Sequence, residues 1–188
     1  MLFAQRWLSL LQEWNAKIDL TAARNDDELV DLMLADSALL SRHVAQGAHV
    51  VDVGTGAGAP GLGLLAFRPD LRATLVEPMQ KRVAFLNTVI GDLITKGLPS
   101  GRVRVLRERV EKLGALDEPG TVMISRATLS PLEWLSQGAR LAPLGEVWVL
   151  LAQQDAPELL GWKASLDLEY RWPLTGAERR ALCFRPVV

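Results

Sequence analysis

The sequence predicts an α/β fold: a doubly wound, mostly parallel sheet with an antiparallel last strand and a small helical N-terminal layer. Three observations predict it. Short apolar runs alternate with helical segments from residue 49 onward, a glycine-rich turn follows the first of these runs, and the residues before it show only helical periodicity. Such alternation is typical of a parallel sheet covered by helices on both faces. We expect the helical layer to span 1–45 and the sheet domain 46–188.

The N-terminal layer is predicted to contain two helices. In the first, apolar side chains recur at helical spacing and form one stripe, at Phe3, Trp7, Leu10, Leu11, Trp14 and Ile18. The second is expected from about Asp26 to Val44, with Asn25 or Asp26 as its N-cap. Polar residues interrupt 1–20, so we expect no signal peptide there, and no apolar run is long enough to predict a transmembrane helix.

The sheet domain is predicted from the alternating segments that follow. Five strands are expected at 49–53, 73–77, 103–106, 121–125 and 146–151. Helices are expected from about Pro60, where proline suits the first turn, and over 79–95 and 131–141. Two closing strands, at 168–172 and 181–187, are joined by a turn at 175–178.

Composition limits the classes of function. The 188 residues suit one α/β domain with a short appendage, and a single cysteine, Cys183, cannot form an internal disulfide. We therefore expect a cytoplasmic protein. Only two histidines accompany that cysteine, so no metal site is predicted. The net charge of −1 is a mild argument against a dedicated nucleic-acid binder, which normally carries a basic surface.

The most informative segment is the glycine-rich turn at 51–61, Val-Asp-Val-Gly-Thr-Gly-Ala-Gly-Ala-Pro-Gly. Glycines let the backbone turn tightly and approach a ligand closely. Asp52 precedes the glycines, and Glu77 ends the next strand, where a carboxylate accepts hydrogen bonds from ribose hydroxyls. Within the turn, 56–61 also fits the dinucleotide pattern. Against a dehydrogenase, the chain leaves no room for a separate substrate domain.

The form Asp-Val-Gly-x-Gly-x-Gly resembles the first motif of Rossmann-like, class I S-adenosylmethionine methyltransferases, in which the acid helps to hold the methionine end. Further segments resemble one family, the ribosomal RNA small-subunit methyltransferase G family (glucose-inhibited division protein B). They are Glu13–Ala22, Asp36-Ser37, Asp52–Gly61, Arg68-Pro69, Lys81–Leu86, Arg109–Glu111 and Ser125–Ala127. They follow the family's order over nearly the whole chain.

The resemblance implies methylation at N7 of a guanine in 16S ribosomal RNA, with S-adenosylmethionine as cofactor. The partner would be this RNA or the small ribosomal subunit, with no DNA or membrane partner, and the protein is expected to be a monomer. Carried over by motif, the cofactor-binding residues would be Asp52, Gly54, Gly56, Ala59, Glu77, Val110, Glu111 and Arg126. Gly54, Gly56 and Ala59 would line the methionine and sulfonium region, and Val110 and Glu111 would border the adenine.

Arg126 is also the expected catalytic residue. Guanine N7 carries an in-plane lone pair and attacks without losing a proton, so the reaction needs alignment rather than a general base. An arginine fork fits the O6/N7 edge or a phosphate, and because a grip on N7 would block attack, we expect O6 or phosphate as its target.

Three departures from the family pattern leave alternatives open. The usual Arg-His before Asp-Ser is Leu32-Met33, the usual lysine after the fifth strand is Ala152, and a normally bulky loop residue is Ala59. Two of these changes remove positive charge where RNA would lie. The alternatives are a methyltransferase with another RNA or a small-molecule acceptor, and a non-catalytic cofactor-binding module that docks a partner.

Overall fold

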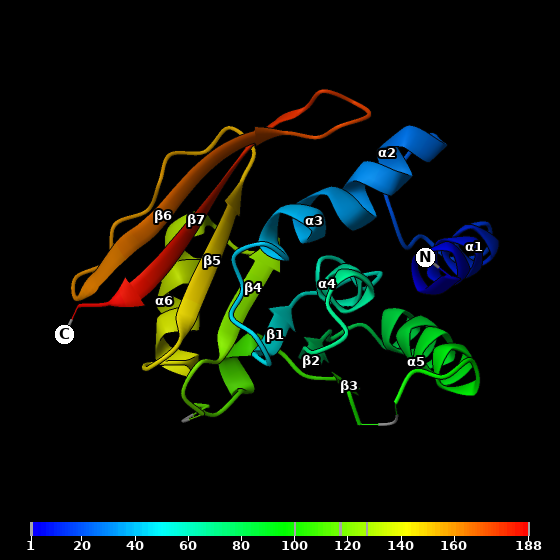
Figure 1. Ribbon diagram of the computed structural model, residues 1–188, viewed down its shortest axis with the longest axis horizontal. Helices are drawn as coiled ribbons and strands as arrows, with labels where there is room; N and C mark the ends of the chain where they lie inside the picture. Colours follow the sequence, from blue (N-terminus) through cyan, green and yellow to red (C-terminus); the bar gives the residue numbers. More distant parts are fainter. Residues whose placement is uncertain (1, 100, 117, 127, 188) are drawn as a thin grey trace.

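The computed structural model describes residues 2–99, 101–116, 118–126 and 128–187 and contains one seven-stranded sheet (Figure 1). The strand order is β3-β2-β1-β4-β5-β7-β6. The strands are β1 (His49–Val53), β2 (Arg72–Val76), β3 (Val103–Leu106), β4 (Val122–Arg126), β5 (Glu146–Leu151), β6 (Trp162–Arg171) and β7 (Glu178–Pro186). Strands β1 to β5 pair in parallel, and β7 pairs antiparallel with both β5 and β6, as predicted.

The sheet order reverses between β1 and β4, where the chain crosses from one half of the sheet to the other. In open α/β sheets, ligands bind outside the carboxyl ends of the strands at this switch point. The glycine-rich turn follows β1, and Arg126 ends β4. The topology therefore brings both expected site segments to the same edge.

Helices cover both faces of the sheet (Figure 1). One face carries α1 (Leu2–Asn15), α4 (Gly61–Phe67), α5 (Gln80–Thr95) and the segment α2 (Asp26–Val30), η1 (Asp31–Ala35) and α3 (Asp36–Leu40). The other carries α6 (Pro131–Leu141) and the short 3₁₀ helix η2 (Val110–Lys112). None of the helices in the described part of the chain combines the length and apolar character that a membrane crossing requires.

The two closing strands and the second N-terminal helix differ from the prediction. The closing strands are longer than predicted: half-buried and exposed residues alternate along the whole of β6, with Lys163, Asp167 and Glu169 on the exposed side. The predicted helix from Asp26 to about Val44 ends at Leu40 and changes to a π-helical turn over Asp31–Ala35. Asn25 is its N-cap, and its side chain accepts a hydrogen bond from the Glu28 N–H.

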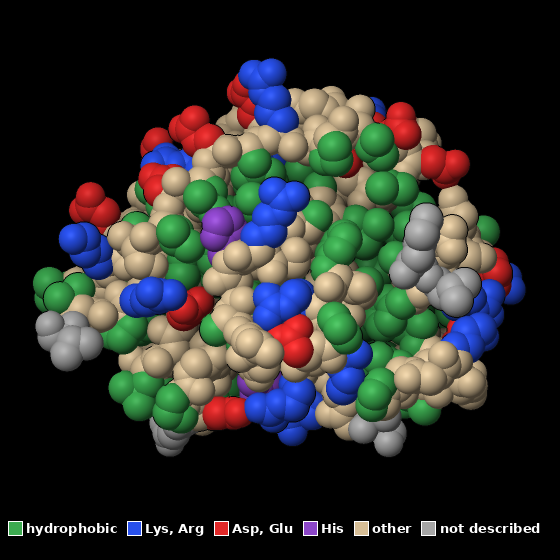
Figure 2. All heavy atoms as spheres, viewed as in Figure 1, with side chains coloured by type: hydrophobic (Ala, Val, Ile, Leu, Met, Phe, Trp, Pro, Cys, Tyr) green, Lys and Arg blue, Asp and Glu red, His purple; other side chains and the backbone are tan. Residues whose placement is uncertain are grey.

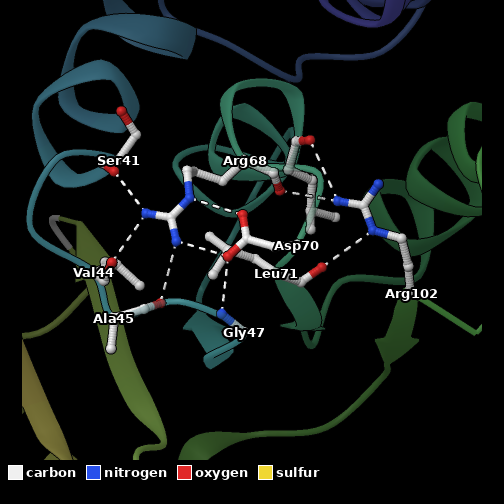
Figure 3. Close-up of polar contacts among 9 residues, drawn as sticks. Ser41, Val44, Ala45, Gly47, Arg68, Asp70, Leu71 and Arg102 are labelled. Carbon is white, nitrogen blue, oxygen red and sulfur yellow. Dashed lines mark hydrogen bonds and ion pairs between the residues drawn. The ribbon is translucent and has the colours of Figure 1, made fainter.

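Arg68, which follows α4, is bonded to the segment that connects α3 with β1 (Figure 3). Its guanidinium forms a bidentate pair with Asp70, with N···O distances of 2.8 and 2.7 Å. It also donates to the carbonyls of Ser41 and Val44, just beyond α3. Nearby, Arg102 donates to the carbonyls of Leu71 and Arg68. Both arginines thus stabilise connections between elements.

Candidate active site

Asp52 lies beneath the glycine-rich turn and is fully buried. Its Oδ2 accepts hydrogen bonds from the Thr55 hydroxyl and from the Gly61 N–H, the latter at 2.8 Å. Its Oδ1 has no hydrogen-bond partner among the described residues. Burial raises the pKa of Asp52 to about 6, although the two hydrogen bonds oppose the shift. The structure therefore places Asp52 where it shapes the turn from below.

Glu77, which directly follows β2, is buried with 2% of its surface exposed. Its two carboxylate oxygens accept the backbone N–H groups of Gly56, at 3.0 Å, and Met79, at 2.9 Å. Arg82 Nη1 lies 3.8 Å from the same carboxylate. The expected ribose-binding acid is thus held directly against the glycine-rich turn.

Two glycines of the turn have conformations that a side chain would disturb. Gly54 has φ of +69°, and an added Cβ would collide with the side chain of Thr128 from the segment after β4. Gly56 has φ of +59°, but a Cβ there would meet nothing nearer than the Gly54 carbonyl at 4.0 Å. The surface above Gly56 is therefore open enough for a ligand to approach the backbone.

The remaining expected cofactor residues occupy different environments. Ala59 is buried in the cluster that joins the turn to the N-terminal layer, so it supports the turn from within. Val110 is buried in the cluster on the other face, and Arg140 donates to its carbonyl at 2.9 Å. Glu111, its neighbour in η2, is exposed. Of these three expected cofactor residues, Glu111 is exposed, and Ala59 and Val110 are buried.

A cavity of about 230 Å³ opens at the carboxyl ends of β4 and β5, beside the glycine-rich turn. Its walls combine aromatic and aliphatic side chains with two arginines. They are formed by Leu32, Asp36, Ser125, Arg126, Thr128, Leu129, Pro131, Trp134, Val149, Leu150, Leu151, Ala152, Gln154, Tyr170, Trp172 and Arg179. Thr128 connects the cavity to the turn because it also packs against Gly54. A cavity of this size can hold one purine base.

Arg126 lies in the wall of this cavity, with 19% of its side chain exposed. Its Nη1 donates to the Leu32 carbonyl and to Asp36 Oδ2, the latter at 3.0 Å. Asp36 is 2% exposed, and its Oδ1 accepts the Tyr170 hydroxyl at 2.8 Å and Trp172 Nε1 at 2.7 Å. The expected catalytic residue is therefore paired with a helix carboxylate and also faces the cavity.

Sequence reasoning missed the aromatic side of the cavity. Tyr170, Trp172 and Arg179 come from the C-terminal hairpin, and the Arg179 guanidinium lies 3.9 Å from the centre of the Trp172 ring. Tyr170 and Trp172 donate to Asp36 across more than 130 residues of chain. No local pattern connects segments this far apart. The family motif at Asp36-Ser37 was the one signal that pointed to this part of the site.

Basic side chains do not form one continuous patch on the face shown in Figure 2, where they are interspersed with acidic and apolar ones. Several arginines that could have contacted RNA are paired internally. Arg104 donates to Thr74, Arg180 pairs with Asp167, and Arg185 pairs with Glu146. Ala127, the third residue of the Ser-Arg-Ala motif, lies outside the described residues.

The positions that depart from the family pattern fall into two groups. Leu32 and Ala152 line the cavity, so the lost charges would have stood at its rim. Met33 is 3% exposed and packs in the core, away from solvent.

Several solved structures similar in fold to this chain have methyltransferase names. One is an S-adenosylmethionine-dependent methyltransferase from Aquifex aeolicus, with a TM-score of 0.60, 17% identity and coverage of 96% of this chain and 98% of that one. Another is the mitomycin 7-O-methyltransferase MmcR, with a TM-score of 0.59, 15% identity and coverage of 97% and 60%. These similarities confirm the Rossmann-like fold.

Sequence comparisons go further than the fold. A ribosomal RNA small subunit methyltransferase G from Myxococcus xanthus is 35% identical over 192 residues, covering 96% of this chain and 85% of the relative. The protein of the same name from Halorhodospira halophila is 38% identical over 155 residues, covering 81% and 70%. The family model for rRNA small subunit methyltransferase G matches residues 3–177. This chain belongs to the rRNA small subunit methyltransferase G family.

Proposed function

We propose that this protein transfers a methyl group from S-adenosylmethionine to N7 of a guanine in 16S ribosomal RNA. The observation that carries the proposal is the base-sized cavity beside the glycine-rich turn, with Arg126 in its wall. We further propose that the enzyme acts in the cytoplasm as a monomer on this RNA or on the small subunit. We also propose two parts of the chain: a helical N-terminal layer, residues 1–45, packs against the methyltransferase domain, residues 46–188.

The residues at the carboxyl ends of β1 and β2 fit the cofactor. Each carboxylate oxygen of Glu77 accepts one backbone N–H and keeps a second lone pair for a ribose hydroxyl. The open approach at Gly56 and the unpartnered Oδ1 of Asp52 suit a polar ligand against the turn. We assign Gly54, Gly56 and Ala59 to the methionine side and Val110 and Glu111 to the adenine side. When bound, S-adenosylmethionine supplies an electrophilic methyl group.

The chain's own residues would orient the acceptor. A guanine in the cavity would stack among the aromatic and aliphatic walls, which exclude water from N7. Arg126 would bind O6 from the side, which leaves the N7 lone pair free to attack. Because N7 loses no proton, the lining needs no base, and alignment supplies the rate enhancement.

The first test is Arg126→Ala in a methyl-transfer assay with isolated small subunits and radiolabelled cofactor. We expect a loss of rate of about 100-fold or more, typical of removing one electrostatic contact to the reacting group. Arg104→Ala, which removes an arginine bonded to Thr74 on β2, should keep the wild-type rate. Undiminished transfer by a folded Arg126→Ala protein would end the assignment.

The apolar residues Leu32 and Ala152 at the cavity favour one alternative, a different RNA or a small-molecule acceptor. Label transfer to small subunits, naked 16S RNA, transfer RNA and small guanine nucleotides separates these cases. The proposal expects label in the small-subunit RNA, at a guanine that mass mapping then identifies. Transfer confined to another acceptor would favour the alternative.

A further inference from the structure

Asp36 joins three distant parts of the chain through one buried carboxylate. It begins α3, while its partners are Arg126 at the end of β4 and the two aromatic residues Tyr170 and Trp172 of the C-terminal hairpin. Figure 1 shows that hairpin extending toward the segment of α2 and α3. All three partners also line the cavity beside the glycine-rich turn.

The hydrogen bonds divide the Asp36 carboxylate into two sides. Oδ1 accepts both aromatic donors, at 2.8 Å from Tyr170 and 2.7 Å from Trp172, and Oδ2 accepts Arg126 Nη1 at 3.0 Å. A carboxylate this deeply buried requires such partners, because an unpaired charge in the interior is very unfavourable. The two neutral donors fix the direction in which Oδ2 points. The arginine is thus held in one orientation.

Arg126 is bound through only one of its three nitrogens. Nη1 donates to both the Leu32 carbonyl and Asp36 Oδ2, whereas Nε and Nη2 have no hydrogen-bond partner among the described residues. The side chain lines the cavity and is partly exposed there. One edge of the guanidinium is therefore fixed by protein, and the rest of its donors stay available to a base.

We propose that Asp36 is a positioning residue that fixes Arg126 so that its unpaired donors meet O6 of the acceptor guanine. This inference rests on the proposed function, and it adds a residue that does not touch the substrate's reacting atom. Tyr170 and Trp172 act through Asp36 in the same way. Without this network, Arg126 would sample several orientations and lose its discrimination for O6.

Asp31 provides a matched control. It is equally buried, it begins the π-helical turn directly before α3, and it also binds the hairpin. Its carboxylate accepts the N–H groups of Leu174 and Thr175 and the Thr175 hydroxyl, at 3.1, 2.7 and 2.8 Å. In the described part of the chain it has no bond to Arg126. Loss of Asp31 should therefore weaken the hairpin attachment without loosening the arginine.

The experiment compares two acceptors in small subunits reconstituted after the methylated position has been mapped. One carries guanine there and the other carries 2-aminopurine, which retains N7 but lacks O6. We expect the wild type to prefer guanine about 10- to 100-fold in kcat/KM, the range of a hydrogen bond to a charged group. Asp36→Asn keeps an acceptor for Tyr170 and Trp172 but turns an NH₂ toward Arg126, so its preference should fall below about threefold.

Asp31→Asn should lower the melting temperature while keeping the wild-type preference for guanine. Tyr170→Phe removes one hydrogen bond and no charge, so it should reduce the preference partly and keep the fold if Asp36→Asn does not fold. Full guanine preference in folded Asp36→Asn, or in Tyr170→Phe when that is the folded variant, would overturn this inference alone. Absence of transfer by the wild type to any small-subunit RNA would overturn the proposed function and, with it, this inference.

Discussion

Oε2 of Glu77 accepts the backbone N–H of Gly56 at 3.0 Å, so the acid that ends one strand is bonded to the turn that follows its neighbour. This bond fixes the turn in the absence of a ligand. The same oxygen is one that a ribose hydroxyl would also bind. The same residue therefore contributes both to the shape of the turn and to the proposed cofactor site.

Replacement of Glu77 by alanine should affect both properties. Two partly buried N–H groups would lose their acceptor, at a cost of about 0.5–1.5 kcal/mol each in the free energy of unfolding. Affinity for S-adenosylmethionine should fall by about 10- to 100-fold, as measured by calorimetry. The exposed acid of α1 serves as a control, and Glu13→Ala should change neither quantity. Wild-type affinity in Glu77→Ala would remove this residue from the cofactor site.

A pair of glycine substitutions separates backbone strain from ligand contact. Gly56 and Gly47 have φ of +59° and +71°, and neither would place a Cβ closer than 4.0 Å to the protein. Alanine at either position should lower the free energy of unfolding by about 1–2 kcal/mol, because a residue with a Cβ is strained in the left-handed conformation. Gly56→Ala should in addition weaken cofactor binding at least 10-fold, whereas Gly47→Ala should leave it unchanged. Equal cofactor affinities in the two variants would contradict the assignment of the turn.

The buried carboxylate of Asp52 predicts a pH dependence of stability. Its pKa is about 6 in the folded protein and near 3.8 in the unfolded chain, so between these values the folded state holds a proton that the unfolded state has lost. The free energy of unfolding should therefore fall as pH rises from 4 to 6, by about 2 kcal/mol of the about 3 kcal/mol that this group contributes in all. Urea titrations at several pH values measure the slope.

The control for that slope is Asp52→Asn, which cannot titrate. Stability of the wild type relative to this variant should decrease through the same window. Asp70 and Asp92 act in the opposite sense, because Arg68 and Arg6 lower their pKa values and their contributions disappear as pH falls below about 4. Both acids remain in the variant, so their effects cancel in the comparison. Parallel stability curves for the two proteins would refute the prediction.

The N-terminal layer is predicted to support the glycine-rich turn through Trp7. Its indole Nε1 donates to the Ala57 carbonyl at 2.9 Å, and the side chain is fully buried. Trp7→Phe should cost about 1–3 kcal/mol, because the buried carbonyl would lose its donor, and should weaken cofactor binding severalfold. Trp14, half-buried against Phe85, is the control, and Trp14→Phe should preserve cofactor affinity. Unchanged cofactor binding in Trp7→Phe would separate this layer from the site.

Local sequence patterns predicted where some residues of the candidate site lie in the fold. Glycines around an acid, and a second acid at the next strand end, placed Asp52 and Glu77 beside one turn because parallel strands end at the same edge. The burial of Asp52 beneath the turn was not predictable, since it depends on how Thr55 and Gly61 fold back over it. The link from Asp36 to Trp172 is also invisible locally, because it requires the final hairpin to reach the second helical segment.

Strand β7 lies between β5 and β6, so the sheet is complete only after the last of its strands has been synthesised. Strands β1 to β3 and the glycine-rich turn are encoded before residue 107, so that half can begin to assemble while the chain is still growing. The cavity wall at Tyr170, Trp172 and Arg179 is synthesised only after that half. A nascent chain therefore contains the whole glycine-rich turn before it contains every wall of the cavity.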